Sequence, residues 1–88
     1  SDKKMGSIVV NDGLYAVLKE GKRALSLLPV GILSCHGEFK KSDLVEIKTS
    51  KGQVIGLGLA KYDAEKLTSY LGKKDQPEFI HYDHLHLF

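Results

Sequence analysis

The sequence has little of several residue types: among its 88 residues there is one cysteine, one arginine and no tryptophan. A single cysteine, Cys35, excludes an intrachain disulfide, and a reducing, cytoplasmic setting is the simplest interpretation. Its neighbour His36 would point to the opposite face of a strand, so we predict a structural thiol and not a catalytic one. The planar guanidinium group of arginine binds phosphates and guanines through two hydrogen bonds at once. A single arginine, Arg23, and a net charge of only +2 therefore weaken the case for a nucleic-acid ligand.

Long hydrophobic runs are also missing. The longest apolar stretch, residues 25–33, is interrupted by Ser26, Pro29 and Gly31, whereas a membrane-spanning helix needs about 20 apolar residues. No signal peptide is visible in the first residues. The composition, with 42% hydrophobic and 27% charged residues, is that of a chain that folds. We therefore predict a small domain with no membrane association.

Short apolar segments and turn residues predict a mostly β chain with two short helices. The first helix follows Asp12 as its N-cap, packs with Leu14, Val17 and Leu18, and ends at Gly21. The second follows Asp63 and ends at Gly72. The predicted strands are residues 8–10, 32–36, 44–47, 54–60, 79–82 and 85–88. This order favours an α+β mixed barrel over a repeated βαβ sheet.

Two glycines interrupt the predicted strand 54–60. Gly56 and Gly58 fall on one face of that strand, where glycine weakens packing. The usual reason is a sharp bend or the close approach of another backbone, and the alternative is a ligand lying against that face.

Motifs that carry catalysis are not found in the sequence. There is no phosphate-binding loop, no dinucleotide fingerprint and no nucleophile elbow. The acidic residues offer no specific pair for acid–base chemistry. The sequence therefore predicts a domain without catalytic activity and without a cofactor of its own.

Three of the four histidines lie close together near the end of the sequence, at positions 81, 84 and 86. On a strand, His84 and His86 would point to one face, which is a workable spacing for two metal ligands. Asp83 would point away and no cysteine joins them. A metal site at His84 and His86 is thus one candidate, and an exposed polar strand is the other.

A basic surface is the second candidate site. Lys22 and Arg23 follow the first predicted helix, and further lysines lie in turns among acidic residues. The four tyrosines could offer faces on which bases stack. Contact with RNA and simple solvation of the turns are both compatible with these residues.

Three segments, in order, resemble the C-terminal domain of glutamate 5-kinases. The segments are G-S-I-V-V-N-D-G from Gly6, L-S-L-L-P-V-G-I from Leu25 and G-E-F from Gly37. The family shows G-x-I-x-V-D-x-G-A, K-S-L-L-P-x-G-I and G-x-F-x-R-G-D-x-V in these places. Later matches are Gly52, Gly58, Tyr62, His81 and Leu85. The sequence departs from the family at Asn11, where the family has aspartate, and at Lys41-Ser42, where it has arginine and glycine.

The resemblance implies a PUA fold, a compact pseudo-barrel with flanking helices, over residues 6–88, with residues 1–5 as a tail or linker remnant. It also implies an accessory role in an enzyme that phosphorylates the γ-carboxylate of glutamate with ATP and Mg²⁺, the first step of proline biosynthesis. The kinase domain is not within these 88 residues. The expected partners are that kinase domain or a homo-oligomer.

Two other functions stay open at this point. PUA domains elsewhere bind structured RNA, and by analogy the surface here would involve Lys22, Arg23 and Gly31, facing the last strand. The third possibility is a small metal- or ligand-binding module that uses His84 and His86.

Overall fold

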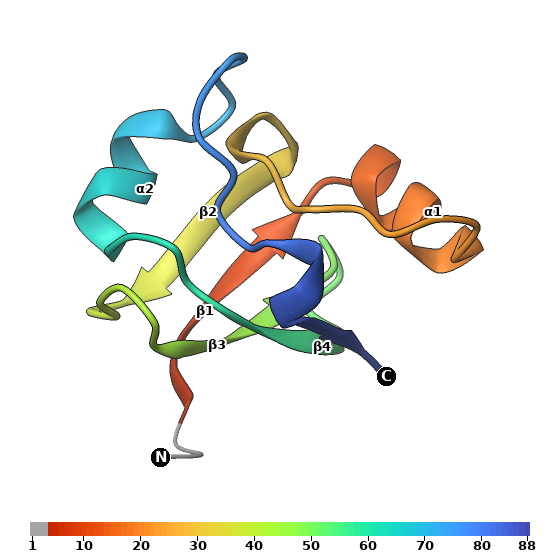
Figure 1. Cartoon of the computed structure of the whole chain (residues 1–88), viewed down its shortest axis with the longest axis horizontal. Helices are drawn as coiled ribbons and strands as arrows, with labels where there is room; N and C mark the ends of the chain where they lie inside the picture. Colours follow the sequence, from red (N-terminus) through yellow and green to blue (C-terminus); the bar gives the residue numbers. More distant parts are fainter. Residues whose placement is uncertain (1–3) are drawn as a thin grey trace.

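A mixed five-stranded sheet forms the centre of the fold across the described residues 4–88, in the order β2-β1-β3-β4-β5 (Figure 1). β1 pairs in parallel with β3, and the other neighbours are antiparallel. In this computed structural model the strands are β1 (Lys4–Val10), β2 (Ile32–Gly37), β3 (Leu44–Lys48), β4 (Val54–Leu59) and β5 (Leu85–Leu87). The helices are α1 (Asp12–Glu20) and α2 (Ala64–Tyr70), with single 3₁₀ turns η1 (Pro29–Gly31) and η2 (Tyr82–His84).

The predicted α+β class is confirmed, and most of the predicted elements are present. β1 begins at Lys4, two residues before the predicted domain boundary at Gly6, and residues 1–3 of the predicted tail lie outside the described residues. Neither α1 nor α2, the helices of the described part of the chain, is long and apolar enough to cross a bilayer.

The predicted strand 79–82 is the main error. Ile80 makes only an isolated bridge with Leu27, in which Leu27 N–H donates to the carbonyl of Ile80 at 2.9 Å. The chain then turns, because Nδ1 of His81 accepts a hydrogen bond from the N–H of Asp83 at 3.1 Å. This bond favours the 3₁₀ turn η2 over a continued strand.

The start of α1 is one residue earlier than predicted. Oδ1 of Asn11 accepts a hydrogen bond from the N–H of Leu14 at 2.7 Å, so Asn11 is the N-cap. Asp12 is the first helical residue, and its carboxylate accepts from the hydroxyl of Ser50. Gly21 ends the helix in the left-handed conformation, as predicted. Only part of the predicted face is packed, since Leu18 is buried while Val17 is exposed.

We expect Asn11→Ala to lower the free energy of unfolding by about 1 kcal/mol, because it removes the capping bond. Asp12→Ala is the matched control, since it removes only a hydrogen bond between exposed groups, and we expect a loss below about 0.5 kcal/mol. Urea unfolding followed by circular dichroism measures both. A larger loss for Asp12→Ala would contradict the assignment of the cap.

Helix α2 begins as predicted, because the carboxylate of Asp63 accepts from the N–H of Lys66 at 2.8 Å. Leu67 is fully buried on its inner face. Cys35 of β2 packs against the same helix, with its sulfur 3.4 Å from the hydroxyl oxygen of Thr68. The cysteine therefore lies at a packing contact between β2 and α2.

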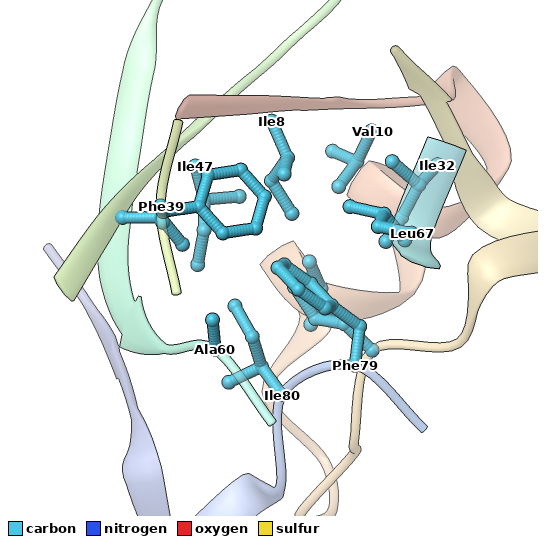
Figure 2. Close-up of a cluster of buried hydrophobic side chains, with 12 residues drawn as sticks. Ile8, Val10, Ile32, Phe39, Ile47, Ala60, Leu67, Phe79 and Ile80 are labelled. Atoms are coloured by element: carbon cyan, nitrogen blue, oxygen red, sulfur yellow. The ribbon is translucent and has the colours of Figure 1, made fainter. Parts of the chain in front are cut away.

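The core lies between the sheet and the segments that cover it (Figure 2). Ile8, Val10 and Ile47 project from β1 and β3 toward Phe79, which comes from the segment before η2. The Phe79 ring lies 5.5 Å from that of Phe39 and 5.4 Å from that of Tyr62, between ring centroids. The hydroxyl of Tyr62 donates to the carbonyl of Pro77 at 2.8 Å, and burial raises the pKa of Tyr62. Aromatic packing thus ties the C-terminal segment to the sheet.

The two glycines of β4 allow the last strand, β5, to lie close against β4. A Cβ atom on Gly56 would overlap the carbonyl oxygen of His86, and one on Gly58 would lie 2.7 Å from Cδ1 of Ile80. Both glycines are buried on the core side of β4, opposite Ile47 and Val45 of β3. The prediction of a close backbone approach is confirmed at Gly56, and packing against Ile80 accounts for Gly58.

Candidate functional site

A groove of about 210 Å³ separates the end of α1 from the C-terminal segment. One wall is the loop that follows α1, including Arg23 and Leu25, and the other is Tyr82 with β5. In Figure 1 this loop (orange) and the C-terminal segment (blue) run close together. The full lining, which we call the Arg23–Tyr82 groove, is Leu18, Gly21, Arg23, Ala24, Leu25, Tyr82, Leu85 and Leu87.

Two long-range contacts hold the walls of the Arg23–Tyr82 groove together. One is the bridge between Leu27 and Ile80, and the other is a hydrogen bond from the N–H of Tyr82 to Oγ of Ser26 at 3.0 Å. The two residues of that bond are 56 positions apart in the sequence. The groove therefore exists only in the folded chain.

The chemistry of the groove combines one cation with one open aromatic face. The Tyr82 side chain is 47% exposed, and its ring lies on that of His81 with 4.1 Å between centroids. Arg23 is exposed on the facing wall, and none of the described lining residues is acidic. A guanidinium group with an aromatic ring can hold a phosphate and a stacked base.

Lys22 lies beside Arg23 in the same loop and is exposed. Its ammonium group is 3.9 Å from the carboxylate of Glu20, and both side chains are mostly exposed. An exposed pair at this distance contributes little stability, so the ammonium group can exchange Glu20 for another anion.

Gly31 does not join this pair. It is buried against α1, where a Cβ atom would lie 2.7 Å from Cδ2 of Leu14, and its carbonyl accepts from the N–H of Asn11 at 2.8 Å. It lines a second, separate cleft beside η1. Of the three residues predicted to contact RNA, the structure thus brings Lys22 and Arg23 to one groove edge and uses Gly31 for packing.

The histidines lie in different elements. His84 ends the turn η2, whereas His86 lies in β5, opposite Leu57 of β4. The alternation of a strand therefore does not relate the two side chains, which was the basis of the predicted metal spacing. Within residues 4–88, no group of three or more His, Cys, Asp or Glu side chains is placed to hold a metal ion. Metal binding by His84 and His86 stays a prediction, which zinc titration with a fluorescent indicator would test.

Sequence reasoning pointed to Tyr82 only as one of four tyrosines and did not find Leu85 or Leu87 as groove residues. The other tyrosines have different environments: Tyr62 and Tyr70 pack against each other, and Tyr15 lies under the ammonium group of Lys19. No local pattern could have identified the groove, because its walls meet through the contact between Ser26 and Tyr82.

A protein-family model described as "PUA domain" matches residues 6–79, and the chain belongs to this family. The match spans most of the 88 residues.

The curated relatives are glutamate 5-kinases, as the sequence resemblance predicted. The chain is 45% identical over 82 residues to the glutamate 5-kinase of Chlorobaculum tepidum, covering 93% of this chain and 23% of the relative. It is 38% identical over 94 residues to that of Methylococcus capsulatus, covering 94% of this chain and 25% of the relative. The chain thus spans about a quarter of the length of the relatives it matches.

Solved structures with lower identity share the fold. A PUA domain from Aeropyrum pernix, in a tartrate complex, superimposes with a TM-score of 0.79 at 20% identity, over 94% of this chain and 43% of the other. An H/ACA RNP bound to a substrate RNA contains a chain with a TM-score of 0.70 at 23% identity, over 96% of this chain and 24% of the other. These likenesses establish the fold.

Proposed function

We propose that this chain is the non-catalytic accessory domain of a glutamate 5-kinase. The observation that supports the proposal is a match at 45% identity that covers 93% of this chain but only 23% of the relative. The longer protein that carries the domain, here called the parent protein, would phosphorylate glutamate with ATP and Mg²⁺ in the cytoplasm, for proline biosynthesis. The ATP and Mg²⁺ site would lie in the remaining three-quarters of the parent protein.

The role of the domain in the parent protein would be assembly or regulation. We expect that deletion of residues 6–88 from the parent protein changes its oligomeric state or its inhibition by proline, and leaves turnover close to that of the intact protein. Analytical ultracentrifugation and a proline titration of the kinase reaction measure the two effects. Loss of turnover with an unchanged oligomeric state would contradict an accessory role.

RNA binding is the second candidate function, and the Arg23–Tyr82 groove favours it. The Tyr82 ring is exposed and Arg23 lies on the facing wall, so a base could stack while its phosphate contacts the guanidinium group. The low net charge of +2 argues for few phosphate contacts and hence a weak, salt-sensitive complex.

If RNA binds this groove, Tyr82→Ala is expected to weaken binding of tRNA about tenfold, because one stacked base contributes about 1–3 kcal/mol. Arg23→Ala should weaken it and reduce its salt dependence. Fluorescence anisotropy with the 88-residue chain at low and high salt measures both. Lys51→Ala, in the exposed β3–β4 turn, is the control. Equal effects of Lys51→Ala and Arg23→Ala would leave only non-specific attraction and remove this function.

A further inference from the structure

Three large apolar side chains are exposed together beside η1. Val17 is 42% exposed, Leu28 is 46% exposed and Val30 is 41% exposed. With the half-buried Leu14 and Leu25, they line an open cleft of about 370 Å³. We call these five side chains the Leu28 patch. Single exposed apolar residues are ordinary on a protein surface, but a contiguous group usually marks an interaction site.

Two backbone hydrogen bonds hold the η1 segment that carries Leu28 and Val30 of the Leu28 patch. The N–H of Gly31 donates to the carbonyl of Leu28 at 3.0 Å, and the N–H of Gly72 donates to the carbonyl of Pro29 at 3.0 Å. Leu27 and Pro29 are buried on either side of Leu28, so Leu28 is the residue that faces outward. Leu28 and Val30 therefore lie on the surface while their neighbours Leu27 and Pro29 fill the core.

The residues that line the cleft indicate which kind of partner could bind there. The remaining lining residues are Asn11, Gly13, Ser26 and Gly31, so none of the described lining side chains carries a charge. A nucleic acid needs basic side chains for its phosphates, and a small ligand needs several polar groups that converge on it. An uncharged, open apolar surface fits the apolar surface of another protein domain.

The relatives that this chain matches are much longer than the chain itself. This chain covers 23% of one glutamate 5-kinase and 25% of another, so about three-quarters of such a protein lies outside it. We infer that the Leu28 patch is the surface on which the kinase part of the parent protein docks. The inference rests on the proposed function, since it takes the parent protein to be a glutamate 5-kinase.

To contact the Leu28 patch, the kinase part must reach from one end of β1 to the other. The patch lies beyond the C-terminal end of β1, whereas the described chain begins at the other end of β1, at Lys4 (Figure 1). Seven residues of strand separate the two ends by about 20 Å. The kinase part, about three times the size of this domain, is large enough to reach across that distance.

Hydrogen exchange in the intact parent protein tests the docking. We expect residues 25–31 to exchange about tenfold more slowly in the parent protein than in the 88-residue chain. The docked kinase part would bury apolar side chains of the patch, and a stabilisation of about 1.4 kcal/mol from this burial corresponds to a tenfold factor. The double substitution Leu28→Lys with Val30→Lys should abolish the difference. Leu33→Lys is the matched control, since Leu33 is 56% exposed on β2 and lies outside the patch.

Both sets of substitutions replace exposed side chains, so the 88-residue chain should keep its circular dichroism spectrum in each case. Equal exchange of residues 25–31 in the parent protein and the 88-residue chain would overturn the docking, as would equal effects of the double substitution and of Leu33→Lys. Glutamate-dependent ADP formation is measured on the same parent sample. Slower exchange of residues 25–31 without this activity would contradict the kinase assignment and support a docked domain of another kind. Activity without slower exchange of these residues would overturn only the docking.

Discussion

Phe79→Ala is expected to lower the free energy of unfolding by about 3–5 kcal/mol, which is the usual cost of removing a buried phenylalanine ring. Phe79 is fully buried, and its ring contacts those of Phe39 and Tyr62 (Figure 2). Its backbone also joins the loop before η1 to the end of β4, through hydrogen bonds with Leu27 and Lys61. Because a small domain has only about 5–15 kcal/mol of total stability, this loss is a large fraction of the total.

The matched control is Phe88→Ala, which removes the same ring from a side chain that is 73% exposed. We expect a loss below about 0.5 kcal/mol, since the backbone bond from the N–H of Phe88 to the carbonyl of Ile55 is kept. Urea unfolding followed by far-ultraviolet circular dichroism compares the two, because the chain has no tryptophan for fluorescence. Similar losses for Phe79→Ala and Phe88→Ala would contradict the position of the core.

Gly56→Ala is expected to cost about 1–3 kcal/mol, because the added methyl group overlaps the carbonyl oxygen of His86 and the neighbouring strands must shift. The effect should extend to the Arg23–Tyr82 groove, since β5 forms part of its wall. We therefore expect faster hydrogen exchange in residues 85–87 together with the loss of stability.

Gly13→Ala is the matched control for Gly56→Ala. A Cβ atom on Gly13 would lie 3.6 Å from Oδ1 of Asn11, an ordinary contact, and alanine is the better helix former. We expect no loss of stability, or a gain of up to about 1 kcal/mol. If Gly56→Ala proved as harmless as Gly13→Ala, the close approach of β5 to β4 would be wrong.

Local patterns in the sequence predicted the parts of the fold that local chemistry determines. The alternation of Val45 and Ile47 indicated the buried face of β3, and both side chains are fully buried. Asp63 and Gly21 marked helix ends through their capping preferences, and both have those roles.

The errors arose where a distant residue decides between two local options. Asn11 and Asp12 are both good N-cap residues, and the N–H of Asn11 is held by the carbonyl of Gly31, which fixes Asn11 just outside the helix. Residues 79–82 are apolar enough for a strand, but within residues 4–88 the one β-bridge they make is that of Ile80 with Leu27. Nothing in the local sequence reveals either contact.

The candidate site was predictable only in part for the same reason. Arg23 was predicted by analogy with the RNA-binding surface of other PUA domains, and Tyr82 only as one of four tyrosines whose faces could stack on bases. Their arrangement on opposite walls depends on the bond between Ser26 and Tyr82 and on the space left by Gly56 and Gly58. The resemblance to the family, by contrast, rested on residues such as Leu28 and Pro29, whose exposure and burial could not be derived beforehand.

Glutamate-dependent formation of ADP tests the central claim most directly. The assay compares the intact parent protein with the 88-residue chain at equal concentration, with ATP and Mg²⁺ present and glutamate added or omitted. If this chain is the accessory domain of a glutamate 5-kinase, the parent protein forms ADP only when glutamate is present, and the 88-residue chain forms none. A parent protein that forms no ADP with glutamate, or an 88-residue chain that forms it alone, would contradict the account.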